Sequence, residues 1–437
     1  MDNAQYIKLM PDAIFKKRYD QWFLIHTQNP SQRLLVKDGA ELVLTSLFRG
    51  RSVGQVAWQF GLNKDGLLVF LKNLNRMTRR KIINFSDQSA KSRYFDLDPP
   101  LDSLSCLITN RCNLGCRHCY LDSGPSTTEL RVNQWINVID QFVGLGGFLL
   151  NITGGEPLMY PGFWDLADFL KNVPALKNLN TNGTLIGPQY LSALKASFDS
   201  VQVSIDGANA KVHDLFRGQK NAFQKTTTAV RLMVEAGIVV NVAFCLTPLN
   251  VGQVERMVEL CQKLGVNRLS ISLAENIGRG VENCIMPAVS GNSSFLAQVF
   301  SLTIRLAGLN TSNLKLTLPF QTGEGPEKQF ICSGDHTQVA YITADGYVTP
   351  CDKLPTDKFG CGNIWYQSLK DIWTSPKMTG FKCRILRQIP QCTNCRLLAF
   401  CPGHCAARAH ANCGDINGED RLACYFAHRV QAACTKK

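Results

Sequence analysis

Short apolar runs alternate with amphipathic stretches from Ser103 to about Ala274. A repeated strand-helix order requires a parallel sheet, because each helix carries the chain back across the sheet before the next strand. Six runs have the length and apolar content of strands: residues 104–108, 148–152, 176–180, 201–205, 239–246 and 269–273. The helices expected between them include residues 128–143, 163–172, 223–236 and 254–264. The sequence therefore predicts an α/β fold built on a parallel sheet.

Three cysteines follow the first predicted strand in a tight loop. Cys112, Cys116 and Cys119 stand in the spacing C-x3-C-x2-C. Cysteine thiolates hold iron-sulfur clusters, and four of them close a cubane, so a loop with three leaves one iron open to a ligand from outside the protein. The alternative is a zinc knuckle, but zinc would want a fourth protein ligand nearby.

Polar turns follow the next predicted strands. They read Thr153-Gly154-Gly155-Glu156-Pro157, Thr181-Asn182-Gly183 and Ser204-Ile205-Asp206-Gly207. Glycines let a backbone come close to a ligand, and a carboxylate there can accept hydrogen bonds from an ammonium group. In parallel α/β folds ligands gather at the carboxyl ends of the strands, where all of these turns lie. We expect one binding site at that edge of the sheet.

Together these motifs resemble those of radical S-adenosylmethionine (radical SAM) enzymes, whose signature is C-x3-C-x-aromatic-C; His118 occupies the aromatic position. In that family the cofactor chelates the open iron, and its cleavage gives a 5′-deoxyadenosyl radical. The resemblance implies a partial (β/α)6 TIM-like barrel and catalytic roles for the three cysteines. It also implies a set of cofactor-binding residues. They are His118 in the cysteine loop, Gly154, Gly155 and Glu156 for the amino group, Asn182, Ser204 and Asp206 for ribose and carboxylate, and Arg217 of the segment His213-Asp214-Leu215-Phe216-Arg217-Gly218 for the carboxylate.

A second group of cysteines occupies the last third of the chain. Its spacing resembles the SPASM extension of radical SAM enzymes, which holds two auxiliary clusters. By resemblance, one [4Fe-4S] cluster takes Cys392, Cys395, Cys401 and Cys424, and the other takes Cys332, Cys351 and Cys405. Cys413 is the alternative to Cys424. Cys361 is the best candidate for the missing fourth ligand, with Cys383 and Cys284 behind it, and without one an iron stays open. Cys106, Cys245, Cys261 and Cys434 are interpreted as packing or surface residues.

Length and composition fit a multi-domain enzyme. A chain of 437 residues exceeds what one core usually holds. No stretch approaches the roughly 20 apolar residues of a membrane span, and the first residues lack the pattern of a secretion signal. Disulfides are rare in reducing cytosol, so the 18 cysteines argue for metal ligation. We expect a cytoplasmic protein with no membrane partner.

The first 95 residues carry sixteen Lys or Arg against seven Asp or Glu, most of the chain's net charge of +13. Three predicted strands (14–19, 22–27 and 33–37) precede three predicted helices (40–48, 52–60 and 64–79). This order resembles a winged helix, and in particular the peptide-recognition domain typified by the small chaperone of pyrroloquinoline quinone biosynthesis. Such domains are often fused to radical SAM maturases of ribosomally synthesised, post-translationally modified peptides (RiPPs).

Three interpretations of this domain compete. The basic end of the third helix, with Arg76, Arg79, Arg80 and Lys81, could grip DNA phosphates. The edge near residues 33–37 could instead take an acidic leader peptide as an added strand, with the third helix as the groove wall. The charged face could also be merely solvated. Fusion to a SPASM enzyme favours the peptide, so we expect no nucleic-acid partner.

The sequence thus predicts a winged-helix-like α+β domain (1–85), a linker (86–100), a radical SAM partial barrel (101–310) and a cysteine-rich SPASM domain (311–437). The predicted function is a peptide maturase that binds a precursor's leader and installs a side-chain cross-link (thioether, carbon-carbon or ether) in its core. The expected cofactors are S-adenosylmethionine and three [4Fe-4S] clusters, with a reductant such as flavodoxin or ferredoxin. Epimerisation is less favoured. The alternatives are a sulfatase-type maturase, an enzyme of cofactor or haem-precursor biosynthesis, and a non-enzymatic zinc or DNA-binding regulator.

Overall fold

The computed structural model describes most of the chain. The described residues are 6–10, 13–18, 21–26, 33–36, 40–48, 51–77, 83–86, 94–95, 100–124, 128–287, 289, 293–309, 313–320, 339–382, 384, 389–401 and 403–434. None of the helices in these ranges has the length and apolar character that crossing a bilayer requires.

A ten-stranded sheet in the order β13-β12-β11-β10-β9-β8-β7-β14-β15-β16 forms the centre of the molecule. The six predicted strands are β7 (Ser103–Leu107), β8 (Leu149–Thr153), β9 (Leu176–Thr181), β10 (Ser200–Ser204), β11 (Val240–Leu246) and β12 (Arg268–Leu273). Each pairs in parallel with the next along the chain. The prediction of a parallel α/β sheet is therefore confirmed.

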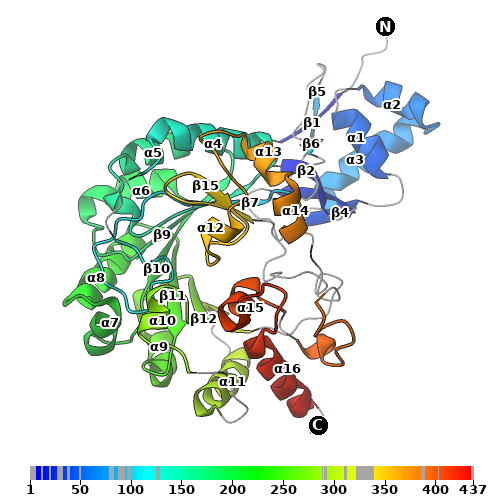
Figure 1. Cartoon of the computed structure of the whole chain (residues 1–437). Coiled ribbons are helices and arrows are strands. Elements are labelled where there is room, and N and C mark those ends of the chain that lie inside the picture. The colour runs from blue at the N-terminus through cyan, green and yellow to red at the C-terminus, as the bar shows by residue number, and fades with distance from the viewer. Residues whose placement is uncertain are drawn as a thin grey trace.

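Helices cover the outer face of this curved sheet (Figure 1). They are α4 (Val132–Gly144), α5 (Phe163–Leu170), α6 (Leu191–Ser197), α7 (Ala210–Arg217), α8 (Ala222–Glu235), α9 (Val254–Leu264) and α11 (Ser294–Ala307). The short helix α10 (Arg279–Glu282) lies instead against the cysteine loop. In β11 the alternate residues Val240, Val242, Phe244 and Leu246 are buried, whereas the residues between them are half-buried. Since successive side chains of a strand point to opposite faces, one face packs on the helices and the other is left for a site.

The C-terminal third continues the same sheet. Strand β14 (Val339–Ile342) pairs in parallel with β7, and β15 (Tyr347–Thr349) and β16 (Gly362–Asn363) follow antiparallel. A hairpin turn lies between β14 and β15, where Gly346 has a φ of 90°. Because β15 runs antiparallel to β14, it leads back toward the amino-terminal end of β7, and Cys351 follows it by two residues.

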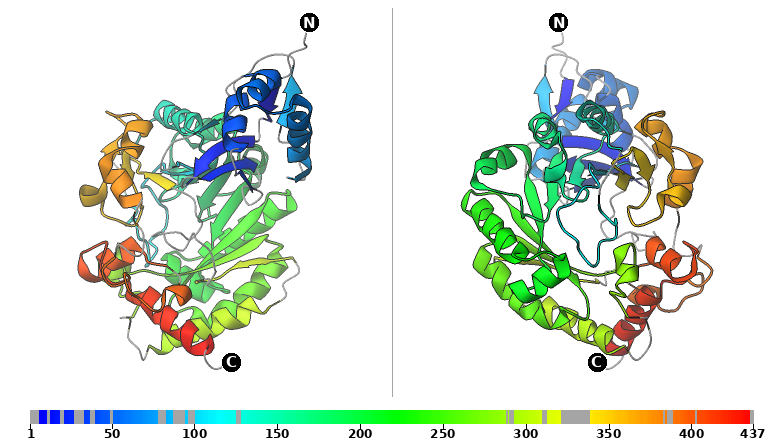
Figure 2. Two further views of the ribbon diagram at one scale, coloured as in Figure 1. Left: turned by 90° about the vertical axis from the view of Figure 1, so that its right-hand side faces the viewer. Right: turned by 60° about the vertical axis from the view of Figure 1, so that its left-hand side comes forward.

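The remaining C-terminal elements are helical apart from one short strand. They are α12 (Thr356–Phe359), α13 (Leu369–Trp373), α14 (Pro376–Lys382), α15 (Ala406–Cys413) and α16 (Arg421–Cys434), with the seventh parallel strand β13 (Lys315–Thr317) beside β12. Figure 2 shows α15 and α16 beside α11 at the edge of the sheet where β13 lies. The Phe320 ring stacks on Phe426 of α16 with 4.2 Å between the ring centroids. This contact joins α16 to the segment that follows β13.

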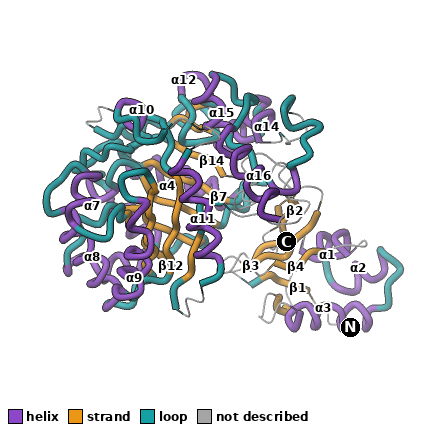
Figure 3. Tube along the Cα trace, turned by 90° about the horizontal axis from the view of Figure 1, so that it is seen from below, coloured by secondary structure: helices purple, strands orange, loops and turns teal. Residues whose placement is uncertain are grey.

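The N-terminal lobe lies beside the main sheet (Figure 3). Strands β2 (Ala13–Arg18), β3 (Gln21–His26) and β4 (Arg33–Val36) and helices α1 (Ala40–Phe48), α2 (Val53–Gln59) and α3 (Lys64–Met77) occur in the predicted order. The lobe also contains three strands that the sequence interpretation missed: β1 (Tyr6–Leu9), β5 (Ile83–Ser86) and β6 (Tyr94–Phe95).

Strand β6 falls inside the predicted linker, and it pairs with β2. Part of that segment is therefore a strand of the N-terminal sheet, whose order is β4-β3-β2-β6. The lobe has its own apolar core, and Ile25 packs on Phe148 just before β8. The lobe thus contacts the amino-terminal end of β8, opposite the edge that carries the polar turns.

Candidate functional site

The three-cysteine loop lies directly after β7, at the carboxyl edge of the parallel sheet. Cys116 is buried, and Cys112 and Cys119 are half-buried. Burial raises the pKa of the Cys112 thiol to about 11. It also raises the pKa of Cys116, although the nearby Arg217 works against it. Thiols of this kind become thiolate ligands when a metal replaces their proton.

Glycines hold this loop against the strand ends. A Cβ added to Gly154 would lie 2.3 Å from the Thr109 carbonyl oxygen, and one on Gly155 would lie 2.3 Å from that of Arg111. Backbone hydrogen bonds join the same segments: Gly155 N–H donates to Thr109 O (2.8 Å) and Glu156 N–H to Arg111 O (2.8 Å). The glycine pair was interpreted as room for a ligand, but its immediate neighbour is the backbone that leads into the cysteine loop.

The segment after β12 holds the cysteine loop in place through contacts that the sequence did not predict. Gly278 has a φ of 55°, and a Cβ there would lie 2.5 Å from the Cys119 carbonyl oxygen. Arg279 donates from its backbone N to Cys119 O (3.0 Å) and from Nε to Cys116 O (3.1 Å). Asn283 Nδ2 donates to Arg117 O at 3.1 Å. The available signal was the polar turn Gly278-Arg279-Gly280, which follows a strand as the other motifs do.

Glu156 connects the ends of β8 and β9. Its side chain is fully buried, and it accepts hydrogen bonds from Thr181 Oγ1 (2.7 Å) and from the backbone N–H of Asn182 (2.8 Å). Asn182 Nδ2 in turn donates to Asn113 Oδ1 in the cysteine loop (2.9 Å). Burial raises the pKa of the Glu156 carboxyl, and these hydrogen bonds oppose the rise. A carboxylate has about four lone-pair sites, so Glu156 could still accept a bond from a cofactor ammonium.

Asp206 and Arg217 form a buried ion pair beside the loop. Arg217 Nη2 lies 2.6 Å from Asp206 Oδ2, and Arg217 Nη1 donates to Cys116 Sγ at 3.6 Å. Burial alone would raise the pKa of Asp206, but Arg217 and His118 hold it below its usual value. His118 Nε2 is 3.6 Å from Asp206 Oδ2, and burial lowers the pKa of His118 to about 4, so its ring is neutral near pH 7. Ser204, at the end of β10, is half-buried opposite Ala243 of β11.

Several polar atoms around Cys116 are buried without a hydrogen-bond partner in the described part of the chain. They are His118 Nδ1, Arg217 Nε and Arg279 Nη2. Buried polar groups in native proteins almost always have partners, so this cluster of open donors and acceptors fits a polar ligand. The residues present therefore suit a polar cofactor beside a thiolate-bound cluster.

The second cysteine group is also brought together in part. Burial raises the pKa of Cys392 to about 11 and that of Cys424 to about 12, and the neighbouring charge of Cys401 adds to both. Cys395 contributes to the environment of Cys392 and Cys401 in the same way. Cys413 is exposed, and its Sγ donates to Ala409 O instead (3.3 Å). The choice of Cys424 over Cys413 remains a prediction, which this proximity favours.

The predicted ligands of the other auxiliary cluster are only partly described. Cys332 and the reserve candidate Cys383 lie outside the described residues. Cys361 donates from Sγ to Phe359 O at 3.4 Å and lies near Lys377 and Lys382. Cys284 is exposed, at a φ of 46°. The fourth ligand of this cluster remains a prediction.

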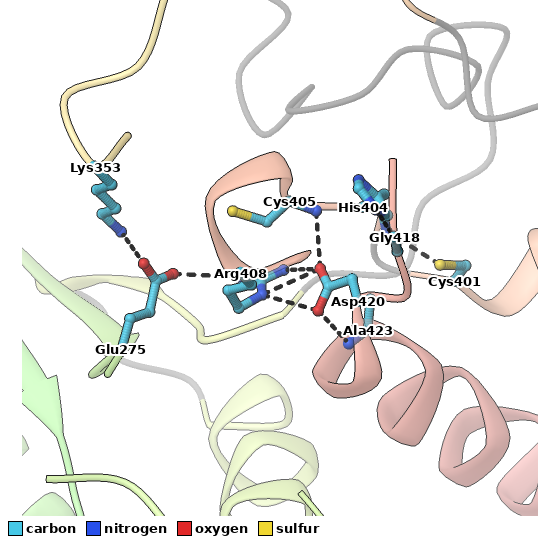
Figure 4. Close-up of polar contacts among 10 residues, drawn as sticks. Glu275, Lys353, Cys401, His404, Cys405, Arg408, Gly418, Asp420 and Ala423 are labelled. Carbon is cyan, nitrogen blue, oxygen red and sulfur yellow. Dashed lines mark hydrogen bonds and ion pairs between the residues drawn. The ribbon is translucent and has the colours of Figure 1, made fainter. Parts of the chain in front are cut away.

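A partly buried ionic network links the main sheet to the C-terminal thiols (Figure 4). Glu275, just after β12, binds Lys353 Nζ (2.9 Å) and Arg408 Nη1 (3.4 Å). Arg408 Nη2 binds Asp420 Oδ2 at 2.7 Å, and Asp420 accepts the backbone N–H of Cys405 at 2.8 Å. Burial would raise the pKa of both carboxyls, but Lys353 and Arg408 hold that of Glu275 low, and Arg408 that of Asp420. The network fixes Cys405 relative to the sheet.

A cavity of about 530 Å³ separates the cysteine loop from the β14–β15 hairpin. Its lining includes Tyr120 from the loop, Tyr341 and Thr343 from the hairpin, and Asp352 and Lys353 after it. Tyr120 OH donates to Asp352 Oδ2 at 2.8 Å, which joins the loop to the residue after Cys351. Burial raises the pKa of both groups, and Lys353 opposes the rise for Asp352. The cavity is thus flanked by two different cysteine groups.

The zinc alternative needs ligands that converge on one ion. Among the residues that the structure describes, no three His, Cys, Asp or Glu side chains are arranged to hold a single metal ion. In a cubane each thiolate binds a different iron, so its ligands need not meet at one point.

Two family profiles match the chain. The profile of the radical SAM superfamily matches residues 106–261, and that of the SPASM iron-sulfur cluster-binding domain matches residues 332–396. The first contains the Cys112–Cys119 loop and the turns that end in Glu156, Asn182 and Asp206. The second contains Cys332, Cys351, Cys392 and Cys395 and ends before Cys401. Radical SAM domains use S-adenosylmethionine with a [4Fe-4S] cluster, and SPASM domains bind auxiliary iron-sulfur clusters.

Curated relatives include two kinds of protein. The antilisterial bacteriocin subtilosin biosynthesis protein AlbA of Bacillus subtilis is 27% identical over 69% of this chain and 67% of its own length. The mycofactocin maturase MftC of Mycolicibacterium smegmatis is 29% identical over 73% of this chain and 82% of its own. The AdoMet-dependent heme synthase of Methanosarcina barkeri is 27% identical over 73% of this chain and 95% of its own.

Solved structures share the fold. Streptococcus suis SuiB bound to its precursor peptide SuiA superposes with a TM-score of 0.73 at 16% identity, covering 95% of this chain and 99% of SuiB. The AdoMet-bound anSMEcpe superposes with a TM-score of 0.56 at 19% identity, covering 77% of this chain and 100% of its own. The SuiB superposition spans nearly all of this chain, so the two proteins share a fold.

Proposed function

The chain carries a radical SAM domain and a SPASM domain, and we propose that it is a RiPP maturase that binds the leader of a precursor peptide and cross-links side chains of its core. Relatives that support this class include the subtilosin biosynthesis protein AlbA and the mycofactocin maturase MftC. The proposed product is a thioether, carbon-carbon or ether linkage.

The observation that carries the proposal is the cavity between the two cysteine groups. One wall is the Tyr120 side of the cluster loop, and the other includes Asp352, next to Cys351. When bound, S-adenosylmethionine and the cluster at Cys112, Cys116 and Cys119 would supply the hydrogen-abstracting radical. A cross-link also requires loss of a second electron from the substrate, and the Cys351 side of the cavity would offer an acceptor in an auxiliary cluster. The proposed number of auxiliary clusters is two.

The chain's own residues would position the substrate there. Tyr120 and Asp352 hold the two walls at a fixed separation through their hydrogen bond. Glu275, Lys353 and Arg408 fix the second wall to the sheet through the ionic network. Such buried, mutually satisfied contacts keep a reaction site rigid, as radical chemistry within one peptide needs.

The N-terminal lobe would capture the leader. Among the strands that the structure describes, β4 lies at an edge of its sheet, so a peptide could pair with it as an added strand. Exposed apolar residues of the helices, Leu42, Val69 and Met77, would contact the peptide's apolar side chains, and the lobe's basic composition suits an acidic leader. For the DNA alternative, Arg76 is exposed, whereas Arg79, Arg80 and Lys81 lie outside the described residues.

A leader-dependence experiment tests this function. The full chain and a variant lacking residues 1–85 would be reconstituted anaerobically and compared on the precursor peptide and on the same peptide without its leader. We expect deletion of the lobe to lower kcat/KM at least tenfold on the full precursor, with little effect on uncoupled cleavage of S-adenosylmethionine. Equal turnover of the precursor by both proteins contradicts leader capture by this lobe.

A second candidate is a haem-forming enzyme, favoured by the match to 95% of the heme synthase of Methanosarcina barkeri. That match covers 73% of this chain. A porphyrin-directed enzyme would have no evident use for a peptide-binding lobe. Conversion of an iron porphyrin substrate, with none of the precursor peptide, would favour this candidate.

The proposed setting is the cytoplasm, because so many reduced cysteines require a reducing compartment. An acidic one-electron carrier such as flavodoxin or ferredoxin is the proposed reductant, and neither nucleic acid nor membrane is a proposed partner. Replacing the chemical reductant with flavodoxin and its reductase should sustain turnover.

A further inference from the structure

Arg217 makes two different buried contacts at the cluster loop. Its Nη1 donates to the sulfur of Cys116 at 3.6 Å, and its Nη2 lies 2.6 Å from Asp206 Oδ2. The exposed fractions of the two side chains are 8% and 1%. The two terminal nitrogens thus serve separate partners, one a predicted cluster ligand and the other a carboxylate.

The charges of Arg217 and Asp206 act strongly on the cluster loop because both side chains are buried and water screens them poorly. Charges near a buried site interact several times more strongly than at the surface. A cluster gains one negative charge when it is reduced, so a cation that donates a hydrogen bond to a ligand sulfur favours the reduced form. A carboxylate near the cluster has the opposite effect and favours the oxidised form. The reduction potential therefore depends on both members of the pair.

Among the residues that the structure describes, Arg217 is the cation whose nitrogen donates to the Cys116 sulfur. Arg279, the other cation at Cys116, donates from Nε to the carbonyl oxygen and not to the sulfur. Glu156 is occupied by Thr181 and Asn182 at the next strand end. Asp206 is held in place on its other oxygen by the backbone N–H of Cys245 at 2.9 Å. The carboxylate is thus fixed where it can balance Arg217.

We propose that the Arg217–Asp206 pair sets the reduction potential of the cluster held by Cys112, Cys116 and Cys119. Arg217 raises the potential through its N–H···S contact, and Asp206 lowers it by cancelling the arginine's charge. Asp206 thereby keeps the cluster a strong reductant while Arg217 remains next to the cofactor site. This role requires only the assembled cluster and is independent of the peptide substrate.

The test is a potentiometric titration of the reconstituted full-length protein, followed by electron paramagnetic resonance. Asp206→Asn, Arg217→Gln and the double variant are compared with the unaltered chain, without S-adenosylmethionine so that the cofactor adds no charge. The resonance that changes when S-adenosylmethionine is added afterwards identifies the cluster in question. Iron content shows that each variant is loaded. Glu255→Gln serves as the control, since Glu255 pairs with Arg305 at 3.0 Å on the surface.

The two single variants should shift the potential in opposite directions. Asp206→Asn should raise it and Arg217→Gln should lower it, each by at least a tenfold change in the ratio of reduced to oxidised cluster, or about 59 mV for one electron. The double variant should fall between them. Shifts in the same direction would indicate a merely structural disturbance and overturn the proposal, as would shifts no larger than that of Glu255→Gln.

If Arg217→Gln takes up no iron, Arg217→Lys replaces it because lysine keeps the charge. A raised potential in Asp206→Asn with no rise in Arg217→Lys then supports the proposal, whereas equal potentials in the two variants overturn it. Because no peptide is present, failure here leaves the proposed maturase function untouched, and failure of that function leaves the potentials unchanged.

Discussion

Replacing Gly218 with alanine should damage the cluster loop far beyond its effect on helix α7. Gly218 ends the helix at a φ of 67°, and a Cβ there would lie 2.6 Å from the carbonyl oxygen of Gly115, between two of the cysteines. The left-handed conformation costs alanine about 1–2 kcal/mol. The clash is with backbone, which cannot rotate away, and overpacking of this kind costs about 1–3 kcal/mol more.

Gly265→Ala is the matched control. Gly265 ends α9 in the same way at a φ of 71°, but its added Cβ would meet only Val234 Cγ1 at 3.3 Å, and that methyl group can shift. We expect Gly265→Ala to lower the free energy of unfolding of the apo-protein by about 1–2 kcal/mol. Gly218→Ala should lower it by about 2–5 kcal/mol in total, the sum of the two effects.

The assay combines urea unfolding of the apo-proteins with iron content and 5′-deoxyadenosine formation after anaerobic reconstitution. Gly218→Ala should retain less iron, by the content of one [4Fe-4S] cluster, and should form the nucleoside at least tenfold more slowly. Gly265→Ala should match the unaltered chain in both. If the two alanine variants behave alike in stability, iron and nucleoside formation, the packing of Gly218 on the cluster loop is not what holds the loop.

Three further predictions address other parts of the molecule. Cys424→Ser should lose the iron of one auxiliary cluster whereas Cys413→Ser keeps it; the reverse result on iron analysis would reassign the ligand. Burial lowers the pKa of His213 to about 4, below its unfolded value of 6.5, so the unfolded state binds more protons between these pH values. Apo-protein stability should then fall by about 2 kcal/mol from pH 7 to pH 5, and His213→Asn, compared by urea unfolding, should lose this part of the slope. The N-terminal lobe contacts the start of β8, whose five residues span about 17 Å, so trimming the leader-to-core spacer below about five residues should abolish modification without weakening leader binding.

The parallel sheet was predictable because its signals are local. Alternation of buried positions such as Val240 and Val242 depends on neighbouring residues only, and so do the turns at Glu156 and Asp206. Carboxyl ends of parallel strands meet at one edge by geometry, which is why separate motifs could be assigned to one site. Strands of two to four residues, such as β6 and β13, carry too little pattern to be recognised in this way.

The contacts that hold the site together were not predictable, because their partners are distant in sequence. Arg279 and its partner Cys116 are 163 positions apart in the sequence, and Arg408 and its partner Glu275 are 133 positions apart. An isolated charged residue in a sequence is usually a solvated one, and nothing near Arg408 indicates that it is buried against two carboxylates. Gly154 illustrates a further limit of the sequence. The motif indicated that a glycine is required there, but the structure shows that the reason is close contact with the Thr109 backbone.

The most direct test of the account is the mass of the peptide product. The full chain, reconstituted anaerobically with iron and sulfide, would be incubated with S-adenosylmethionine, a reductant and a candidate precursor peptide. The account predicts 5′-deoxyadenosine together with a peptide that has lost two hydrogens per cross-link, and fragmentation that places the link inside the core. Formation of the nucleoside with a peptide of unchanged mass would contradict a cross-linking maturase.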